Sequence, residues 1–443
     1  MKKKLFAVLL VAILLLLSAC SGNGNGGASP KPGETGKPGG GKVTLDLLHF
    51  HTRETAENSS EAKGYLAMLD KFIDEHPEYT INESTLQQAD YHTKVMALAA
   101  ANEMPDIFFT KGSWVQNFYD NDLMADLTDS IDTGIYREGV FIPFTRGDKI
   151  FASPIQFALT SIVYYNEEMW KDIGYDAFPA TWEELIAANE KFKDKGITTI
   201  ALGNKDKWPY ESCIISTLGD RMTGTDWTQS IILNDGKAKF TDAEFVNTLE
   251  MSKELVPLFN IDFNAINNEQ ADNLYGTGKA ASTIEGAWTI AYLLENAEEE
   301  IIEQTRFALL PSVNNQKGED GTTSGGAGWA ESASSKLTGE ALTAAKELIN
   351  ATTGVEFCKF IMEDSGLLGQ CEVPVVDKES LPGISQRYLD FVDTVKLVPI
   401  YDIQMDGAVI DVMNSKLQEL LGGTATAEDA AAAIQAAQDK LGS

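Results

Sequence analysis

The sequence predicts an α/β protein in which helices cover a parallel β-sheet. Apolar strand candidates at residues 43–50, 79–83 and 106–110 alternate with helical patterns at 60–75 and 91–102. This β-α-β-α-β order favours parallel strands, because parallel neighbours need a crossover connection that is usually a helix. The chain has 443 residues, 43% of them hydrophobic, which is enough for one or two buried cores and excludes a disordered protein.

The remaining elements continue the mixture of strands and helices. Short apolar runs predict further strands at 162–166, 198–202, 280–284 and 307–310. Helical patterns follow Thr181 and Thr241 and cover 341–349, 354–363, 408–421 and 427–441. The charge run Glu298 to Glu300 is interpreted as a solvated helix face. We find neither an internal repeat nor coiled-coil heptads.

The charge balance argues against nucleic acid as a partner. The chain carries 66 acidic and 35 basic residues, for a formal net charge of -31. Such a field repels phosphate backbones and anionic membrane surfaces. Four cysteines are too few for a disulfide framework. Cys358 and Cys371 could form a bridge and leave Cys213 unpaired, although buried free thiols are the simpler interpretation.

The N-terminus has the pattern of an export signal. Lys2 to Lys4 precede an uninterrupted apolar run at 5–17, which is too short to span a bilayer. The following sequence, Leu-Ser-Ala-Cys ending at Cys20, resembles the bacterial lipobox. The resemblance implies that residues 1–19 are a lipoprotein signal peptide and that Cys20 is lipidated. The protein would then be anchored at the outer face of the cytoplasmic membrane, the alternative being an ordinary export signal with a chance cysteine.

Residues 20–42 are predicted to be a lipidated, Gly/Pro-rich tether. From Ser21 onward this segment holds nine glycines and three prolines in 22 residues, so it cannot bury apolar surface. Residues 22–27 match GxGxxG, but they follow no strand. Residues 36–42 match GxxxxGK, but Val43 replaces the required Ser or Thr. Both nucleotide interpretations therefore fail for lack of structural context.

Several segments of the chain carry a family resemblance. They are FIDEHP at 72–77, AAANEMPDIFF at 99–109, YYN at 164–166 with PATWEE at 179–184, and GKAA at 278–281 with EGAW at 285–288. In this order they resemble the extracellular solute-binding proteins of carbohydrate-import ABC transporters, of the maltose-binding-protein type. The resemblance covers about residues 43–441. Thr283 departs from it, since the family often has Met or another apolar residue there.

The resemblance implies a two-lobe periplasmic-binding-protein-like fold with a ligand cleft between the lobes. The N-lobe would take 43–155 with 312–372, and the C-lobe 156–311 with 373–443. A monomer would capture a sugar or oligosaccharide by lobe closure and deliver it to membrane permease subunits. The ATPase would be on another chain. We expect no cofactor and no catalytic activity.

Three tryptophans are candidates for stacking on the apolar face of a sugar ring. The resemblance places Trp288, directly after Glu285-Gly286-Ala287, on a family stacking position and Trp208 near another. Trp329 lies in a loop whose glycines allow close backbone approach. Glu285 is included as a ligand-binding candidate beside Trp288. Each tryptophan has a core interpretation as its alternative.

Polar candidates follow the predicted strands, because ligands in open α/β sheets bind outside the carboxyl ends of the strands. His51 and Arg53 follow the first strand, and Lys111 and Trp114 follow the third. Asp406, before the helix at 408–421, is a weaker candidate. The alternative for all of them is an ordinary solvated loop.

Other classes of function have less support. Glycoside hydrolysis needs a pair of carboxylates, but 66 acidic residues make such pairs inevitable, and we find no GxSxG or HExxH motif. His49 and His51 face the same side of a strand, but two histidines do not complete a metal site. A receptor for a non-sugar solute, and a surface lipoprotein with a glycan-processing or adhesive role, remain alternatives.

Overall fold

The computed structural model describes residues 42–373 and 378–442. The predicted signal peptide, the lipidation site Cys20 and the tether up to Gly41 lie outside these residues. None of the described helices is long and apolar enough to cross a membrane.

A five-stranded sheet forms the centre of the first lobe. Its strand order is β2 (Tyr79–Thr85), β1 (Val43–His49), β3 (Ile107–Lys111), β12 (Trp329–Ala333) and β6 (Ser153–Pro154). β1 is parallel to both β2 and β3, whereas β12 is antiparallel to β3 and β6. The predicted parallel arrangement of the first three strands is therefore confirmed.

Helices complete the first lobe. α1 (Ser60–Glu75) packs against α13 (Gly339–Thr353) and α14 (Val355–Ser365), and α13 also contacts β1 and β12. α1 begins at Ser59, whose hydroxyl accepts a hydrogen bond from the Ala62 N–H at 3.2 Å, which satisfies one of the free N–H groups of the first turn. The lobe also contains α2 (Gln88–Ala101), α3 (Gly112–Asp120) and the hairpin strands β4 (Thr145–Arg146) and β5 (Lys149–Ile150).

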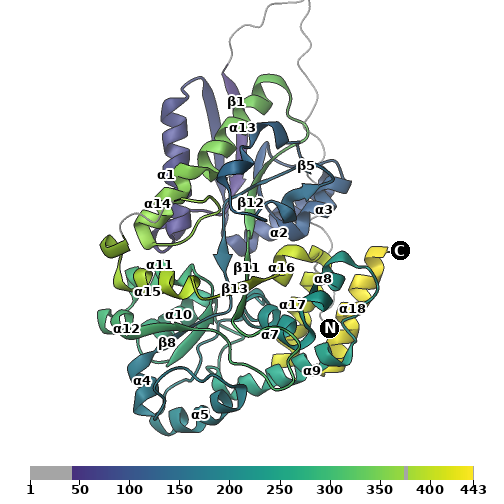
Figure 1. The fold of residues 1–443 in the computed structure, drawn as a ribbon. Helices are drawn as coiled ribbons and strands as arrows, with labels where there is room; N and C mark the ends of the chain where they lie inside the picture. The colour runs from purple at the N-terminus through teal and green to yellow at the C-terminus, as the bar shows by residue number, and fades with distance from the viewer. Residues whose placement is uncertain (1–41, 374–377, 443) are drawn as a thin grey trace, which may run out of the picture. The chain divides into compact units, whose positions relative to one another are not determined.

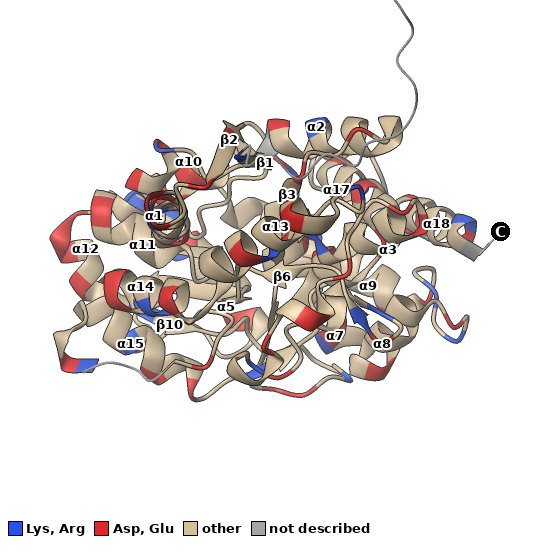
Figure 2. Cartoon of the chain, turned by 90° about the horizontal axis from the view of Figure 1, so that it is seen from above, with Lys and Arg blue, Asp and Glu red and all other residues tan. Residues whose placement is uncertain are grey.

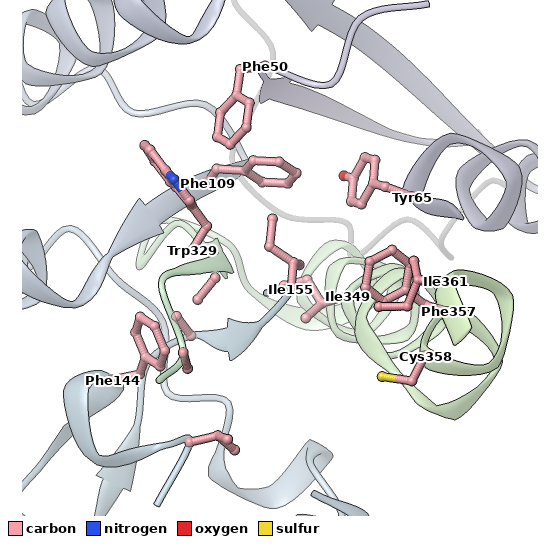
Figure 3. Close-up of a cluster of buried hydrophobic side chains, with 14 of the residues drawn as sticks. Phe50, Tyr65, Phe109, Phe144, Ile155, Trp329, Ile349, Phe357, Cys358 and Ile361 are labelled. Carbon is pink, nitrogen blue, oxygen red and sulfur yellow. The ribbon is translucent and has the colours of Figure 1, made fainter. Parts of the chain in front are cut away.

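Aromatic rings fill the core of this lobe (Figure 3). Tyr65 of α1 packs edge-on to Phe109 of β3, with ring centroids 4.9 Å apart. Phe50 and Trp329 meet at 4.6 Å. The strand sequence Ile-Phe-Phe-Thr of β3 is buried throughout, as expected for a central strand with both faces covered.

The second lobe contains two three-stranded sheets. The first is antiparallel, and its order is β10 (Thr305–Ala308), β8 (Ile162–Asn166), β9 (Ser282–Glu285). The second has the order β13 (Lys396–Val398), β11 (Thr322–Gly326), β7 (Ala158–Leu159). The predicted strand at 198–202 is not one of them. Thr198, Ile200 and Ala201 instead make single bridges to three different residues, so no continuous strand ladder forms.

Helices surround these sheets (Figure 1). They are α4 (Glu167–Asp172), α5 (Trp182–Lys195), α6 (Trp208–Tyr210), α7 (Ser216–Thr223), α8 (Thr225–Leu233), α9 (Ala243–Ser252), α10 (Asn268–Gly276), α11 (Thr289–Asn296), α12 (Glu299–Gln304), α15 (Gly383–Val392), α16 (Tyr401–Gln404), α17 (Gly407–Leu421) and α18 (Ala427–Gln438). α17 and α18 pack on each other and α18 contacts α9. The acidic run Glu298 to Glu300 is exposed at the start of α12, as predicted, and Figure 2 shows it among the acidic surface segments.

Candidate functional site

A cavity of about 440 Å³ lies between the two lobes. Its volume is within the range of roughly 300–1,000 Å³ that is typical of small-molecule sites. Both lobes contribute aromatic rings to its wall, namely Phe50, Trp208, Trp288, Tyr292 and Trp329. Flat rings and hydrogen-bonding groups facing one enclosed space define this cavity as the candidate site.

The first lobe supplies its part of the wall from one edge of the five-stranded sheet. Phe50 and His51 directly follow β1, and Lys111 ends the parallel strand β3. β12 runs antiparallel to β3 with Trp329 paired to Lys111, so the beginning of β12 lies at the same edge. The site therefore forms at the carboxyl ends of the parallel strands, as the sequence predicted.

Trp329 is held firmly by its neighbours. Trp329 is only 7% exposed, and its ring packs against Phe50 at 4.6 Å and edge-on against Trp114 at 5.3 Å. The Lys111 ammonium lies 5.1 Å from the Trp329 ring centroid, within the range of a cation–π contact. Trp329 thus belongs both to the core and to the cavity wall, so the two interpretations of its position are compatible.

In the second lobe, Trp288 and Trp208 form an aromatic corner. Both line the cavity and are half-buried, and their ring centroids are 5.7 Å apart at 66°. Trp288 follows β9 immediately before α11. The indole lies over Gly286, where a Cβ would be only 2.1 Å from the Trp288 ring atom Cζ3. Glycine is therefore required there for this ring position. Tyr292, one helical turn after Trp288, adds a further ring to the wall.

Hydrogen-bonding side chains occupy the space between the rings. The uncharged ones are Thr55, Asn58, Ser59, Gln87, Gln88, Gln156, Thr160, Ser212, Asn267 and Asn268. Gln156, in the connection between β6 and β7, donates to Glu61 at 3.3 Å. Burial raises the pKa of Glu61 to about 7, and the hydrogen bond from Gln156 opposes this shift. Burial also holds the pKa of His51 well below its usual range, so His51 is a neutral hydrogen-bonding group at pH 7.

Two buried carboxyl groups lie at and behind the second-lobe wall. Asp272 lines the cavity, and its nearest polar contact is the Thr289 hydroxyl at 3.3 Å. Glu285 ends β9, is 1% exposed, and does not line the cavity; the Cys213 thiol lies 3.8 Å from it. Burial raises the pKa of Glu285 to about 8. Burial also raises the pKa of Asp272 well above its usual range, and the charge of Glu285 contributes to the Asp272 shift. Glu285 therefore lies behind the cavity wall, three residues before Trp288.

One ion pair crosses the cavity wall from lobe to lobe. The Lys111 ammonium lies 3.0 Å from Asp402 of α16, and both side chains are largely buried. α16 belongs to the second lobe, because Tyr401 is part of that lobe's core and its N–H donates to Ser216. Glu211 is buried close by, and its pKa is raised by burial and by the charge of Asp402. Lys111 thus lies in the cavity wall and is held there by Asp402.

Besides Glu285, three predicted residues lie away from the cavity wall. Arg53 is exposed and makes a bidentate ion pair with Asp70. Trp114 is buried behind Trp329. Asp406 accepts a hydrogen bond from the Ala408 N–H at the start of α17, which is a helix-capping position. The structure gives each of these three a packing, pairing or capping partner and brings the other predicted polar groups, His51 and Lys111, to the site.

Some wall residues were missed in the sequence. Tyr292 could have been found, because it follows Trp288 by four residues and i, i+4 residues share one helix face. Glu61, Gln156 and Asp402 carry no local signal, since only the packing of distant segments brings them together. Among the described residues, no group of three or more His, Cys, Asp and Glu could hold a metal ion. His49 instead bonds Glu83 at 3.1 Å.

We expect Asp402→Asn to weaken ligand binding by roughly tenfold. The substitution keeps the shape of the side chain but removes the charge that attracts Lys111, so closed lobes lose about 1–2 kcal/mol of electrostatic stabilisation. Isothermal titration calorimetry at two salt concentrations would measure this loss. Glu295→Gln is the matched control, because the Lys63–Glu295 pair at 3.2 Å is far more exposed. Equal effects of the two substitutions would contradict a special role for Asp402.

The fold and the cavity define a class of protein: a two-lobe α/β binding protein whose site lies between its lobes. Residues 56–356 match the family of bacterial extracellular solute-binding proteins. This match covers more than half of the chain, and the protein therefore belongs to that family.

Similar proteins agree with this assignment. An uncharacterized ABC transporter extracellular-binding protein of Pyrococcus horikoshii is 24% identical over 305 residues, which cover 66% of each chain, slightly less than two thirds of that relative. A structure from work on xylan utilization by Caldanaerobius polysaccharolyticus is 25% identical, with a TM-score of 0.77 over 89% of this chain and 99% of that one. A chitin oligosaccharide binding protein is 24% identical, with a TM-score of 0.80 over 90% and 98%.

Proposed function

We propose that the protein is the substrate-binding component of an ABC importer, that it captures a neutral sugar or oligosaccharide between its lobes, and that it hands the ligand to membrane permease subunits without chemical change. The observation that carries this proposal is the cavity wall with Trp208, Trp288 and Trp329 among hydrogen-bonding side chains. Aromatic faces cover the C–H face of a pyranose, and the polar groups match its hydroxyls. The similarity to proteins described with chitin oligosaccharide and xylan supports the same ligand class.

The charges around the cavity favour a neutral ligand over an acidic one. Five acidic residues line the cavity: Glu61, Asp206, Glu269, Asp272 and Asp402. Burial favours the neutral forms of Glu61 and Asp272, which leaves three acidic residues for the charge balance. The two lysines in the wall are Lys111 and Lys205, and Lys111 is already paired with Asp402. A carboxylated sugar entering this space would meet more negative than positive charge and would lose its hydration. Such a ligand is therefore disfavoured.

A ligand panel tests the proposal. The purified protein is titrated with neutral malto-, cello-, xylo- and chito-oligosaccharides and with galacturonic acid oligomers, and its melting temperature and binding heat are recorded. At least one neutral saccharide should raise the melting temperature, because a ligand that binds the folded state stabilises it. The acidic oligomers should have no effect. Binding of the acidic oligomers alone, or cleavage of a bound saccharide detected by chromatography, would contradict the proposal.

A second part of the proposal concerns location. We propose that the exported protein is held at the outer face of the membrane by a lipid on Cys20 and acts there as a monomer. The support is the basic, apolar and small-residue pattern that ends at Cys20, together with membership of an extracellular family. The Gly/Pro-rich residues after Cys20 would keep the folded lobes clear of the membrane surface.

Cys20→Ala is expected to abolish membrane association or to block removal of the signal peptide. The folded part of the chain is strongly acidic, and an anionic membrane would not retain it by charge. Fractionation of cells followed by detection of the protein in membrane and soluble fractions would measure the effect. Normal processing and unchanged membrane partition of the Cys20→Ala protein would disprove lipidation at this residue.

A further inference from the structure

Two cysteines meet where the chain leaves α14. Cys358 lies inside the helix and Cys371 follows the turn after it, and both side chains are fully buried. The Cys371 N–H donates to the Cys358 sulfur at 3.3 Å. Figure 3 shows Cys358 near Phe357, and both belong to the hydrophobic cluster of the first lobe. In the structure both residues are free thiols, as is Cys213.

The backbone around this pair is fixed on both sides. Gly366 ends α14 in the left-handed conformation, with φ of 73°, and turns the chain back along the helix. Gly369 then lies so close to Cys358 that a Cβ there would be 2.6 Å from the sulfur. Cys371 itself makes an antiparallel bridge to Tyr136, and the Arg137 N–H donates to the Gln370 carbonyl at 2.9 Å. The ordered backbone on both sides therefore holds the two cysteines close together.

From this geometry we propose that Cys358 and Cys371 form a disulfide bond in the exported protein. The bond would close a ring of 14 residues, 358 to 371, and tie the end of α14 to the segment paired with Tyr136. Disulfides form and persist outside the cytoplasm, which is where this family acts. The proposal depends on export and on the position of these thiols, and it does not depend on which ligand the cavity binds.

Formation of the Cys358–Cys371 bond requires an oxidant that itself contains a disulfide, which is either an oxidoreductase or a small molecule. The Cys358 thiolate attacks one sulfur of that disulfide and releases the other as a thiolate. The Cys371 thiolate then attacks the Cys358 sulfur, which forms the new bond and releases the second thiol of the oxidant. The two cysteines lose two protons and two electrons, and the oxidant gains the electrons. Because both sulfurs are buried in the folded protein, the exchange takes place while residues 366–371 are still closing over α14.

Once the pair is packed in the folded protein, Cys358 is the member whose thiolate is favoured. The Cys371 thiol beside it and the positive charge of Arg137 lower the pKa of Cys358, while the same interaction raises the pKa of Cys371. The Arg137 Nε–H donates to the Gly369 carbonyl at 2.8 Å, which holds the guanidinium next to the pair. Cationic neighbours favour the thiolate, which is the reactive form.

Peptide mapping of the full chain, purified from the cell surface without reductant, tests this directly. The protein is denatured in an alkylating agent and digested with trypsin, which places Cys358 in peptide 347–359 and Cys371 in peptide 360–378. We expect these two peptides to be joined and to separate only after reduction. Cys213, in peptide 208–221, is the internal control and should be alkylated in both samples. Separate, alkylated peptides 347–359 and 360–378 in the unreduced sample would overturn the proposal.

Stability provides a second readout, taken on the same samples as the peptide mapping. Reductant should lower the melting temperature of the natural chain by several degrees, because the cross-link restricts the unfolded chain. The same reductant should leave Cys371→Ala unchanged, and Cys213→Ala should keep the full response. The disulfide would likewise be rejected if reductant did not change the melting temperature of the natural chain and mapping of the same sample showed free thiols.

Discussion

Trp288→Ala is expected to weaken saccharide binding by about tenfold or more and to leave the fold intact. Stacking of a flat ring on an aromatic side chain contributes roughly 1–3 kcal/mol in nucleic-acid complexes, and a sugar face of similar area should contribute a comparable or smaller amount. Each 1.4 kcal/mol corresponds to a factor of ten in the dissociation constant. The Trp288 ring lines the cavity and is only half-buried, so its removal enlarges an existing space. Calorimetry with and without ligand gives affinity and stability in one experiment.

Trp170→Ala is the matched control for this prediction. Trp170 is fully buried in the second-lobe core, and its Nε1–H donates to Ser282 at 2.9 Å. Its truncation should cost about 3–5 kcal/mol of folding stability, as is usual for a buried tryptophan. The protein that remains folded should bind with normal affinity. If Trp288→Ala behaved like Trp170→Ala, with lost stability and unchanged affinity, Trp288 would be a core residue.

Gly286→Ala examines the same site without removing the indole. A methyl group at this position would overlap the Trp288 ring, 2.1 Å from its nearest atom. The backbone of Gly286 is not in the left-handed region, so alanine is tolerated locally and the ring has to move. Binding should therefore weaken although every aromatic side chain is present. Unchanged affinity would show that the position of the ring is unimportant.

The sequence predicted much of the fold because the strand and helix signals were local. The alternation of apolar strands and capped helices at 43–110 identified the parallel core of the first sheet. The segment 198–202 is apolar and buried, as a strand would be, but its residues make only single bridges, to Phe259 and to two residues of the segment 280–283. Backbone pairing of that kind depends on tertiary contacts, so the spacing of apolar residues in the sequence does not predict it.

The candidate site was predictable where it depends on strand ends and not where it depends on distant contacts. Lys111 was predicted because it follows a strand, and Trp288 because it follows a strand and falls on a stacking position of the family that the sequence resembles; both line the cavity. Arg53 also follows a strand, yet its guanidinium turns outward to Asp70 on α1. Asp402 is 291 residues from Lys111 in sequence, and only the approach of the two lobes makes them a pair.

The second large effect is the loss of folding stability expected when a buried arginine is replaced. Arg221 of α7 is 2% exposed, and its guanidinium donates to the carbonyls of Leu310, Pro311 and Thr322. These carbonyls belong to the connection between β10 and β11 and to the start of β11. Burial lowers the pKa of Arg221 to about 10, so the side chain still carries its charge at pH 7. One cation therefore donates hydrogen bonds to three buried backbone carbonyls.

Arg221→Met should destabilise the protein by about 3–5 kcal/mol, because a side chain of similar length leaves three carbonyl groups buried without this donor. The denaturant midpoint of the purified protein would measure the loss. Arg53→Met is the matched control: the same substitution removes the exposed pair with Asp70, which should contribute less than about 1 kcal/mol. A second variant, Arg221→Lys, keeps the charge but offers a single ammonium to acceptors arranged for a planar fork, so it should recover only part of the stability. Equal stability of Arg221→Met and Arg53→Met would mean that the three carbonyls find other donors, and that the segment between β10 and β11 is held by its backbone contacts alone.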